Sequence, residues 1–127
     1  MQTTTRKLVY PGRTGPLRQA RLWEPPTDVY ETDSDLVVKV EIAGMRDGDF
    51  HVALEERRLT ISGTRSAGVR ERRAYYQMEV SSGEFQTEVE LPVAIDPSSV
   101  KADYDDGYLR ISMQKTPAIR VVVREIE

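Results

Sequence analysis

The sequence of 127 residues contains no cysteine. Disulfides, thiol nucleophiles and cysteine-ligated metals are therefore excluded, which is compatible with the cytoplasm, where we expect the protein. There is no apolar run of roughly 18 residues and no apolar signal core at the N-terminus, so we expect neither a membrane span nor secretion. Asparagine is also absent and arginine outnumbers lysine. Both features are typical of a GC-rich genome and of proteins that avoid thermolabile residues.

Groups that could carry out chemistry are scarce. The single histidine, His51, alternates with apolar neighbours and is expected to be a solvated strand residue. Neither a nucleophile elbow nor a glycine-rich phosphate loop occurs. The stretch from Asp103 to Gly107 resembles the start of a calcium loop, but Gln114 stands where such a loop needs a bidentate glutamate. We therefore predict no enzyme activity, no catalytic residue, no metal site and no cofactor.

Charge is distributed unevenly along a chain whose formal net charge is −3. Residues 1–22 carry five of the 18 basic residues and none of the 21 acidic ones, together with two prolines and two glycines. We predict that residues 1–24 form a basic, flexible arm. A nucleic-acid-binding arm would need more stacking aromatics among its cations. A mitochondrial transit peptide is also not favoured, because the two prolines would interrupt the amphipathic helix that such a peptide forms. Nucleic acid is therefore not an expected partner.

Apolar and polar residues alternate with period two over residues 36–42, 50–54, 59–63 and 85–91, with turn signals between them. This pattern predicts short strands of an antiparallel sandwich. Residues 100–113 alternate on both sides of Asp106-Gly107, a dipeptide that favours the type I′ turn of a β-hairpin. We expect one all-β, immunoglobulin-like sandwich domain over residues 25–115.

The hairpin also contains the pattern Ala102-x-x-x-Asp106-Gly107-Tyr108-Leu109, and Leu59-Thr60-Ile61-Ser62-Gly63 precedes it. In this order and spacing the motifs resemble the α-crystallin domain of small heat-shock proteins over roughly Trp23 to Lys115. The resemblance implies an ATP-independent chaperone, or holdase, that binds unfolding proteins and prevents their aggregation under heat or other stress. The alternative is a CS-domain-like co-chaperone adaptor that docks onto an ATP-driven chaperone. Such adaptors usually have an acidic tail and lack the motif Ile-x-Val.

Residues 116–127 form the predicted C-terminal tail, in which Ile119 and Val121 resemble the Ile-x-Val motif of the family. The resemblance implies that these two side chains plug an apolar groove between two strands. The expected groove residues, which would accept the tail or a client, are Val52, Leu54, Val100 and Ala102. Alternatively the tail is the last strand of its own sandwich, and whether it docks on its own chain or on a neighbour stays open.

The connection between Gly63 and Gly83 is long for a compact domain. In the bacterial and plant type of the family this loop carries a strand that pairs with a neighbouring subunit, which implies a strand-exchange dimer and a larger homo-oligomer. A flexible charged surface loop is the alternative. The expected dimer residues are Arg72, Arg73, Tyr75, Tyr76 and Met78. Apolar arm residues are expected to contact unfolded clients, namely Leu8, Val9, Tyr10, Leu17, Leu22 and Trp23.

Overall fold

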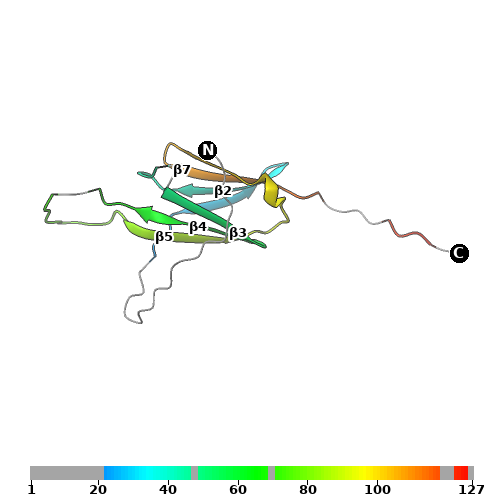
Figure 1. The fold of residues 1–127 in the computed structure, drawn as a ribbon, viewed down its shortest axis with the longest axis horizontal. Helices are drawn as coiled ribbons and strands as arrows, with labels where there is room; N and C mark the ends of the chain where they lie inside the picture. The colour runs from blue at the N-terminus through cyan, green and yellow to red at the C-terminus, as the bar shows by residue number, and fades with distance from the viewer. Residues whose placement is uncertain (1–21, 47–48, 69–70, 118–121, 126–127) are drawn as a thin grey trace, which may run out of the picture.

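The computed structural model describes residues 22–46, 49–68, 71–117 and 122–125, and over these ranges the chain is an antiparallel β-sandwich (Figure 1). The strands are β1 (Thr27–Glu31), β2 (Asp35–Glu41), β3 (Phe50–Glu55), β4 (Arg58–Arg65), β5 (Gly83–Glu90), β6 (Lys101–Asp105) and β7 (Tyr108–Gln114), and a short 3-10 helix, η2 (Pro97–Ser99), precedes β6.

Two sheets make the two layers of the sandwich. The four-stranded sheet has the order β1-β2-β7-β6, and the three-stranded sheet has the order β3-β4-β5. Every strand pairing is antiparallel. The all-β sandwich expected from the alternating pattern is therefore confirmed. Strands β1, β6, β3 and β5 are the edge strands of these sheets.

The core lies between the sheets and contains the apolar stripes that the sequence shows. On β2, Leu36, Val38 and Val40 are completely buried, because alternate residues of a strand point to the same face. Alternation along β2 places Val37 on the opposite face from Leu36 and Val38, yet it is only 5% exposed. It lies on the outer face of the four-stranded sheet, between Tyr30 of β1 and Ser112 of β7 in register. Neighbouring strands on both sides thus cover a side chain that alternation alone places outside.

Strands β6 and β7 form the expected hairpin. Asp106 and Gly107 have φ angles of 53° and 84°, the left-handed conformations that a type I′ turn requires at its two central residues. The inward-facing residues Leu109, Ile111 and Met113 of β7 are completely buried. The Asp106-Gly107 dipeptide therefore predicted the turn correctly, and the period-two pattern predicted the buried face.

Backbone hydrogen bonds attach the two ends of the domain to the sandwich. The Trp23 amide donates to the Glu84 carbonyl (3.2 Å), and the Gln86 amide donates to the Trp23 carbonyl (3.1 Å), so Trp23 pairs in parallel with the outer edge of β5. At the other end, the Thr116 amide donates to the Ala94 carbonyl at 3.0 Å. Between β4 and β5 a long loop projects beyond the sheets, at the opposite end of the sandwich from the chain after β7 (Figure 1).

Candidate functional site

Edge strands β3 and β6 belong to different sheets and meet at the same border of the sandwich. The Phe50 ring at the start of β3 and the Tyr104 ring near the end of β6 have centroids 5.2 Å apart. The Tyr104 hydroxyl donates to the Ile42 carbonyl (2.8 Å) and accepts from the Met45 amide (3.3 Å). Tyr104 therefore fixes β6 to the connection between β2 and β3. We call this border, between β3 and β6, the edge groove, after the groove that the family resemblance predicts there.

The structure brings the predicted groove residues into one apolar cluster. Val52, Val100 and Ala102 are 7%, 6% and 1% exposed and belong to the core, whereas Leu54 is half-buried and packs against it. Leu54 is thus the member of the set with the most apolar surface left for a ligand. Ile119 and Val121 lie outside the described residues, so their docking in the edge groove stays a prediction.

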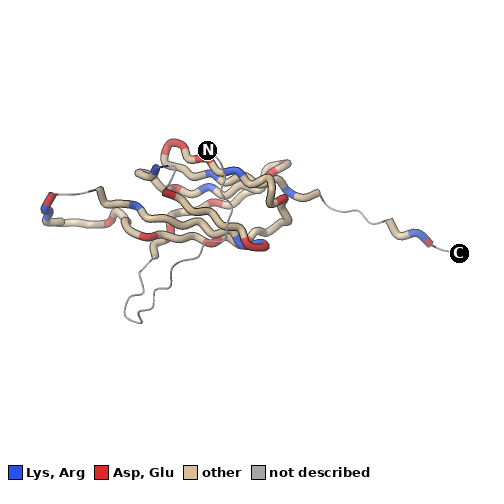
Figure 2. The backbone as a smooth tube through the Cα atoms, viewed as in Figure 1, with Lys and Arg blue, Asp and Glu red and all other residues tan. Residues whose placement is uncertain are grey.

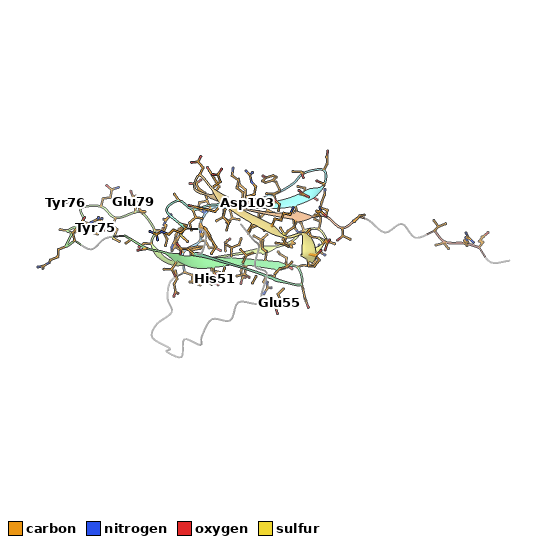
Figure 3. All side chains as sticks on the ribbon, turned by 45° about the horizontal axis from the view of Figure 1, so that its top comes forward. His51, Glu55, Tyr75, Tyr76, Glu79 and Asp103 are labelled. Carbon is orange, nitrogen blue, oxygen red and sulfur yellow. The ribbon has the colours of Figure 1, made fainter. Side chains whose placement is uncertain are left out.

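The loop between β4 and β5 exposes apolar side chains beyond the sandwich, where Figure 3 shows Tyr75 and Tyr76. Tyr75 is 52% exposed, Tyr76 105%, Met78 63% and Val80 80%. Although Tyr76, Met78 and Val80 alternate as in a strand, no strand forms among the described loop residues. A strand needs a partner for its backbone groups, and no other strand in the described part of the chain pairs with this segment.

Arg73 organises the tip of this loop. Its guanidinium donates to Glu71 Oε1 through Nε (3.1 Å) and Nη2 (2.9 Å), and through Nη1 to the Tyr75 hydroxyl (3.4 Å). The hydrogen bond to Glu71, followed by that to Tyr75, raises the pKa of Arg73 above its ordinary value. Arg72, the other predicted arginine of the loop, is exposed.

Arg65 connects three parts of the chain at the root of the loop, a role that the sequence pattern did not indicate. Its Nε donates to the Ser81 carbonyl (3.0 Å), and its Nη1 donates to the Ala43 carbonyl (3.3 Å). The guanidinium carbon lies 4.5 Å from the centroid of the Trp23 ring. Trp23 Nε1 in turn donates to the Gly83 carbonyl (3.2 Å), and its ring packs against Phe85. The residues that make these contacts lie far apart in the sequence, so only folding brings them together.

Of the arm residues predicted to contact clients, only Leu22 and Trp23 lie within the described ranges. Leu22 is 42% exposed, whereas Trp23 is half-buried and attached to β5 as described above. The structure thus places Trp23 on the sandwich, and client contact by the arm stays a prediction.

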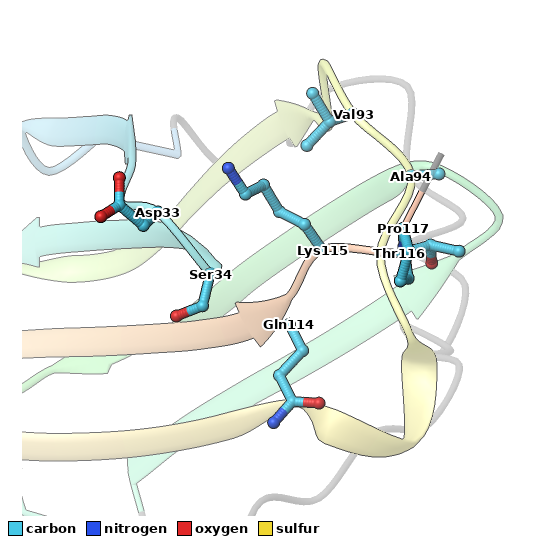
Figure 4. A pocket seen from close by; sticks show the side chains of 8 residues that line it. All are labelled: Asp33, Ser34, Val93, Ala94, Gln114, Lys115, Thr116 and Pro117. Atoms are coloured by element: carbon cyan, nitrogen blue, oxygen red, sulfur yellow. The ribbon is translucent and has the colours of Figure 1, made fainter. Parts of the chain in front are cut away.

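A hollow at the end of β7 is shown in Figure 4. Lys115 Nζ donates to the Thr32 carbonyl at 2.8 Å and lies 3.7 Å from Glu31 Oε1. The Lys115 amide donates to the Ser34 carbonyl at 3.0 Å. The hollow therefore contains the base of the C-terminal tail, and its lining is Asp33, Ser34, Val93, Ala94, Gln114, Lys115, Thr116 and Pro117.

Groups suited to acid–base or metal chemistry are dispersed. His51 is exposed on the outward side of β3, as expected (Figure 3). The part of the chain that the structure describes holds no group of three or more metal-ligating side chains. Over the same ranges, no helix is long and apolar enough to cross a membrane.

A model of the Hsp20/alpha crystallin family matches residues 28–127. The chain belongs to this family. It is 33% identical over 92 residues to small heat shock protein C2 of Rickettsia felis, covering 72% of this chain and 60% of that protein. With the 17.0 kDa class II heat shock protein of Zea mays it shares 36% identity over 93 residues, covering 72% and 60% of the two chains. The chain thus spans about 60% of the length of these small heat-shock proteins.

Solved structures of small heat-shock proteins share the fold. The crystal structure of hspA from Xanthomonas axonopodis has a TM-score of 0.70 and 26% identity, and the match covers 78% of this chain and 100% of that one. HSP18.5 from E. histolytica has a TM-score of 0.68 and 25% identity, covering 82% and 99%. The sandwich is therefore an α-crystallin domain. The family comprises non-enzymatic chaperones that form oligomers and bind client proteins.

Proposed function

We propose that this protein is an ATP-independent holdase of the cytoplasm, which binds exposed apolar segments of unfolding proteins under heat or other stress and prevents their aggregation. The observation that carries the proposal is the apolar border between edge strands β3 and β6, where the half-buried Leu54 leaves apolar surface accessible, in a chain that belongs to the Hsp20/alpha crystallin family. Exposed apolar patches mark interaction sites, and family membership identifies the kind of partner.

The proposal includes assembly of the protein with itself. The loop pairs with a neighbouring subunit and thereby covers its aromatic side chains, which are enriched at protein interfaces. The Ile119-x-Val121 motif of a tail occupies the edge groove by strand addition, in which an extended peptide pairs with an edge strand and fills side-chain pockets. Leu54, half-buried on edge strand β3, supports this arrangement. A groove vacated by the tail then offers the same apolar surface to a client.

Light scattering from a heat-denaturing client enzyme tests the holdase. The protein is added without ATP at rising ratios to the client, and scattering is expected to be suppressed near equal mass, because bound clients no longer meet one another. Added ATP should change nothing. If scattering stays undiminished at every ratio while circular dichroism shows the protein folded at that temperature, the proposal fails and an adaptor for an ATP-driven chaperone becomes the better hypothesis.

A further inference from the structure

The outer face of the three-stranded sheet is acidic. Strand pairing places Glu84, Glu88 and Glu90 of β5 on this face, opposite to the inward-facing Phe85, Thr87 and Val89. Glu55 of β3 lies on the same face. It is in register with Arg58 of β4, which is in turn in register with Glu90 of β5. Figure 2 shows acidic positions along β5. Arg58, which lies 3.7 Å from Glu90, is the only lysine or arginine at the outward positions of these strands among the described residues.

At the centre of this face, two small side chains are buried although they point away from the core. Ala53 is 7% exposed and Ser62 1%, while their strand neighbours Val52 and Ile61 face the core. The Ser62 hydroxyl has no hydrogen-bond partner among the described residues. Polar groups this deeply buried normally have a partner, so the Ser62 hydroxyl leaves an unsatisfied hydrogen-bonding position at the centre of this face, which water or a further segment could satisfy.

The chain itself contains a segment of complementary charge that starts beside this face. Residues 1–22 carry five basic residues and no acidic residue. Their point of attachment is Trp23, whose backbone pairs with Glu84 and Gln86 of β5 and whose ring is held by Arg65. We propose that the basic arm, residues 1–21, docks on the acidic outer face of the three-stranded sheet of its own chain.

Length and charge favour this occupant over others. An extended chain spans about 3.3 Å per residue, so 21 residues reach well over twice the length of the eight-residue strand β5. A second copy of the same face would be repelled by its like charge. An unfolding client would require an apolar surface, which the glutamates do not provide. The outer face of the four-stranded sheet is mixed in sign, because Lys39, Lys101 and Arg110 lie among its acidic residues.

Docking of the arm would control whether arm residues can contact clients. This inference goes beyond the proposed holdase activity. The apolar arm residues Leu8, Val9 and Tyr10 are interspersed with the basic ones, so a docked arm holds them near the sheet. Contacts between exposed charges are weak individually and are screened by salt. Added salt should therefore release the arm, and release makes these residues available to clients.

Engineered cysteines test where the arm lies, because the chain has no cysteine of its own. Thr14→Cys is combined with Thr60→Cys on the outer face of the three-stranded sheet. The matched control combines Thr14→Cys with Ser112→Cys on the outer face of the four-stranded sheet. Both partner positions are half-buried and on central strands. Under mild oxidation we expect at least about fivefold more cross-link with Thr60→Cys, because docking raises the effective concentration of the pair.

The same experiment separates the possible partners. Chains that carry only Thr14→Cys are mixed with chains that carry only Thr60→Cys, and cross-links within one chain should exceed those between chains. Equal cross-linking with both partner positions, cross-linking with neither, or cross-links formed only between different chains would each overturn the proposal. Clients take no part in this measurement, so its outcome is independent of the holdase assay.

Charge reversal provides a second measurement. Glu88→Lys should speed tryptic cleavage after Arg13 and Arg18 by about two- to fivefold, since one surface ion pair contributes modestly. Glu41→Lys, an exposed position on β2 of the other sheet, should leave the cleavage rate unchanged. High salt should abolish the difference between Glu88→Lys and the unsubstituted protein. Equal rates for all three proteins at low salt would contradict docking through this face.

Discussion

Gly63, the last residue of the Leu-x-Ile-x-Gly motif, has a steric role that the sequence does not reveal. It pairs in register with Phe50 on one side and Phe85 on the other, and the two phenyl rings approach edge-on with centroids 6.3 Å apart. A Cβ atom at this position would lie 2.4 Å from the Asp49 carbonyl oxygen and 2.8 Å from Phe85 Cζ. The absence of a side chain therefore allows the two aromatic rings to meet inside the sandwich.

We expect Gly63→Ala to lower the free energy of unfolding by about 2–3 kcal/mol, because backbone or a buried ring must shift to admit the methyl group. Urea denaturation followed by circular dichroism measures this change. Thr64→Ala, at the exposed neighbouring position, is the matched control and should stay within about 0.5 kcal/mol of the unsubstituted protein. Equal stability of the two variants would show that the space around Gly63 adjusts freely.

Alternation in the sequence predicts which way a side chain points but not what covers it. Val37 and Ser62 both point outward, yet both are buried. Thr87 shows the converse, since a polar side chain stands at an inward-facing position of β5. Its hydroxyl accepts a hydrogen bond of 3.3 Å from Thr27 Oγ1 at the start of β1. These environments depend on residues far away in the sequence, which a local pattern does not contain.

Among the secondary-structure elements, the hairpin was the most predictable because all its determinants are local. The Asp106-Gly107 turn and the apolar residues of β7 lie within one short stretch. The pairing of Trp23 with Phe85 has no such signal, as its two partners lie at opposite ends of a long stretch of chain. The edge groove could be placed only through the family resemblance, because no local pattern shows which strands become edges.

The loop between β4 and β5 is expected to contribute to assembly but not to the stability of the sandwich. Replacing Tyr76 and Met78 together by serine removes side chains that are 105% and 63% exposed. The free energy of unfolding should therefore change by less than about 0.5 kcal/mol, while the mass of the assembly measured by light scattering after size-exclusion chromatography falls.

The control for the loop is Tyr76→Phe with Met78→Leu, which keeps the apolar surface and should preserve the assembly. Unchanged mass in the serine variant would remove the loop from the interface and favour the alternative of a charged surface loop. A large loss of stability in the serine variant would show instead that these side chains pack within their own chain.

At the scale of the whole molecule, the two segments with predicted binding roles leave the sandwich in different directions. The loop projects from one end of the sandwich and the chain after β7 leaves from the other (Figure 1). Hydrogen bonds from Lys115 to Ser34 and from Thr116 to Ala94 fix the base of the tail. Only Thr116, Pro117 and Ala118 separate Lys115 from Ile119, and three residues span about 10 Å. The length of this linker therefore limits how far from the end of β7 a docking site for the tail motif can lie.

If the tail occupies an edge groove, Ile119→Ala with Val121→Ala should reduce the size of the assembly, because two branched apolar side chains no longer fill the groove. Light scattering after size-exclusion chromatography measures the mass. Val122→Ala with Val123→Ala is the matched control, since these neighbours are 77% and 87% exposed, and it should leave the mass unchanged. The same mass for both double variants would exclude a specific role for the Ile-x-Val motif.

Trp23 is the only tryptophan of the chain, and it lies at the junction between the arm and the sandwich. Its indole is stacked under Arg65 and packed on Phe85, and it donates to a backbone carbonyl. The emission of this one fluorophore therefore comes from a single place in each subunit. Spectroscopy of the unlabelled protein can therefore follow the surroundings of Trp23 separately from unfolding of the seven described strands, which gives the chain an intrinsic optical probe at the point where its N-terminal residues join the sandwich.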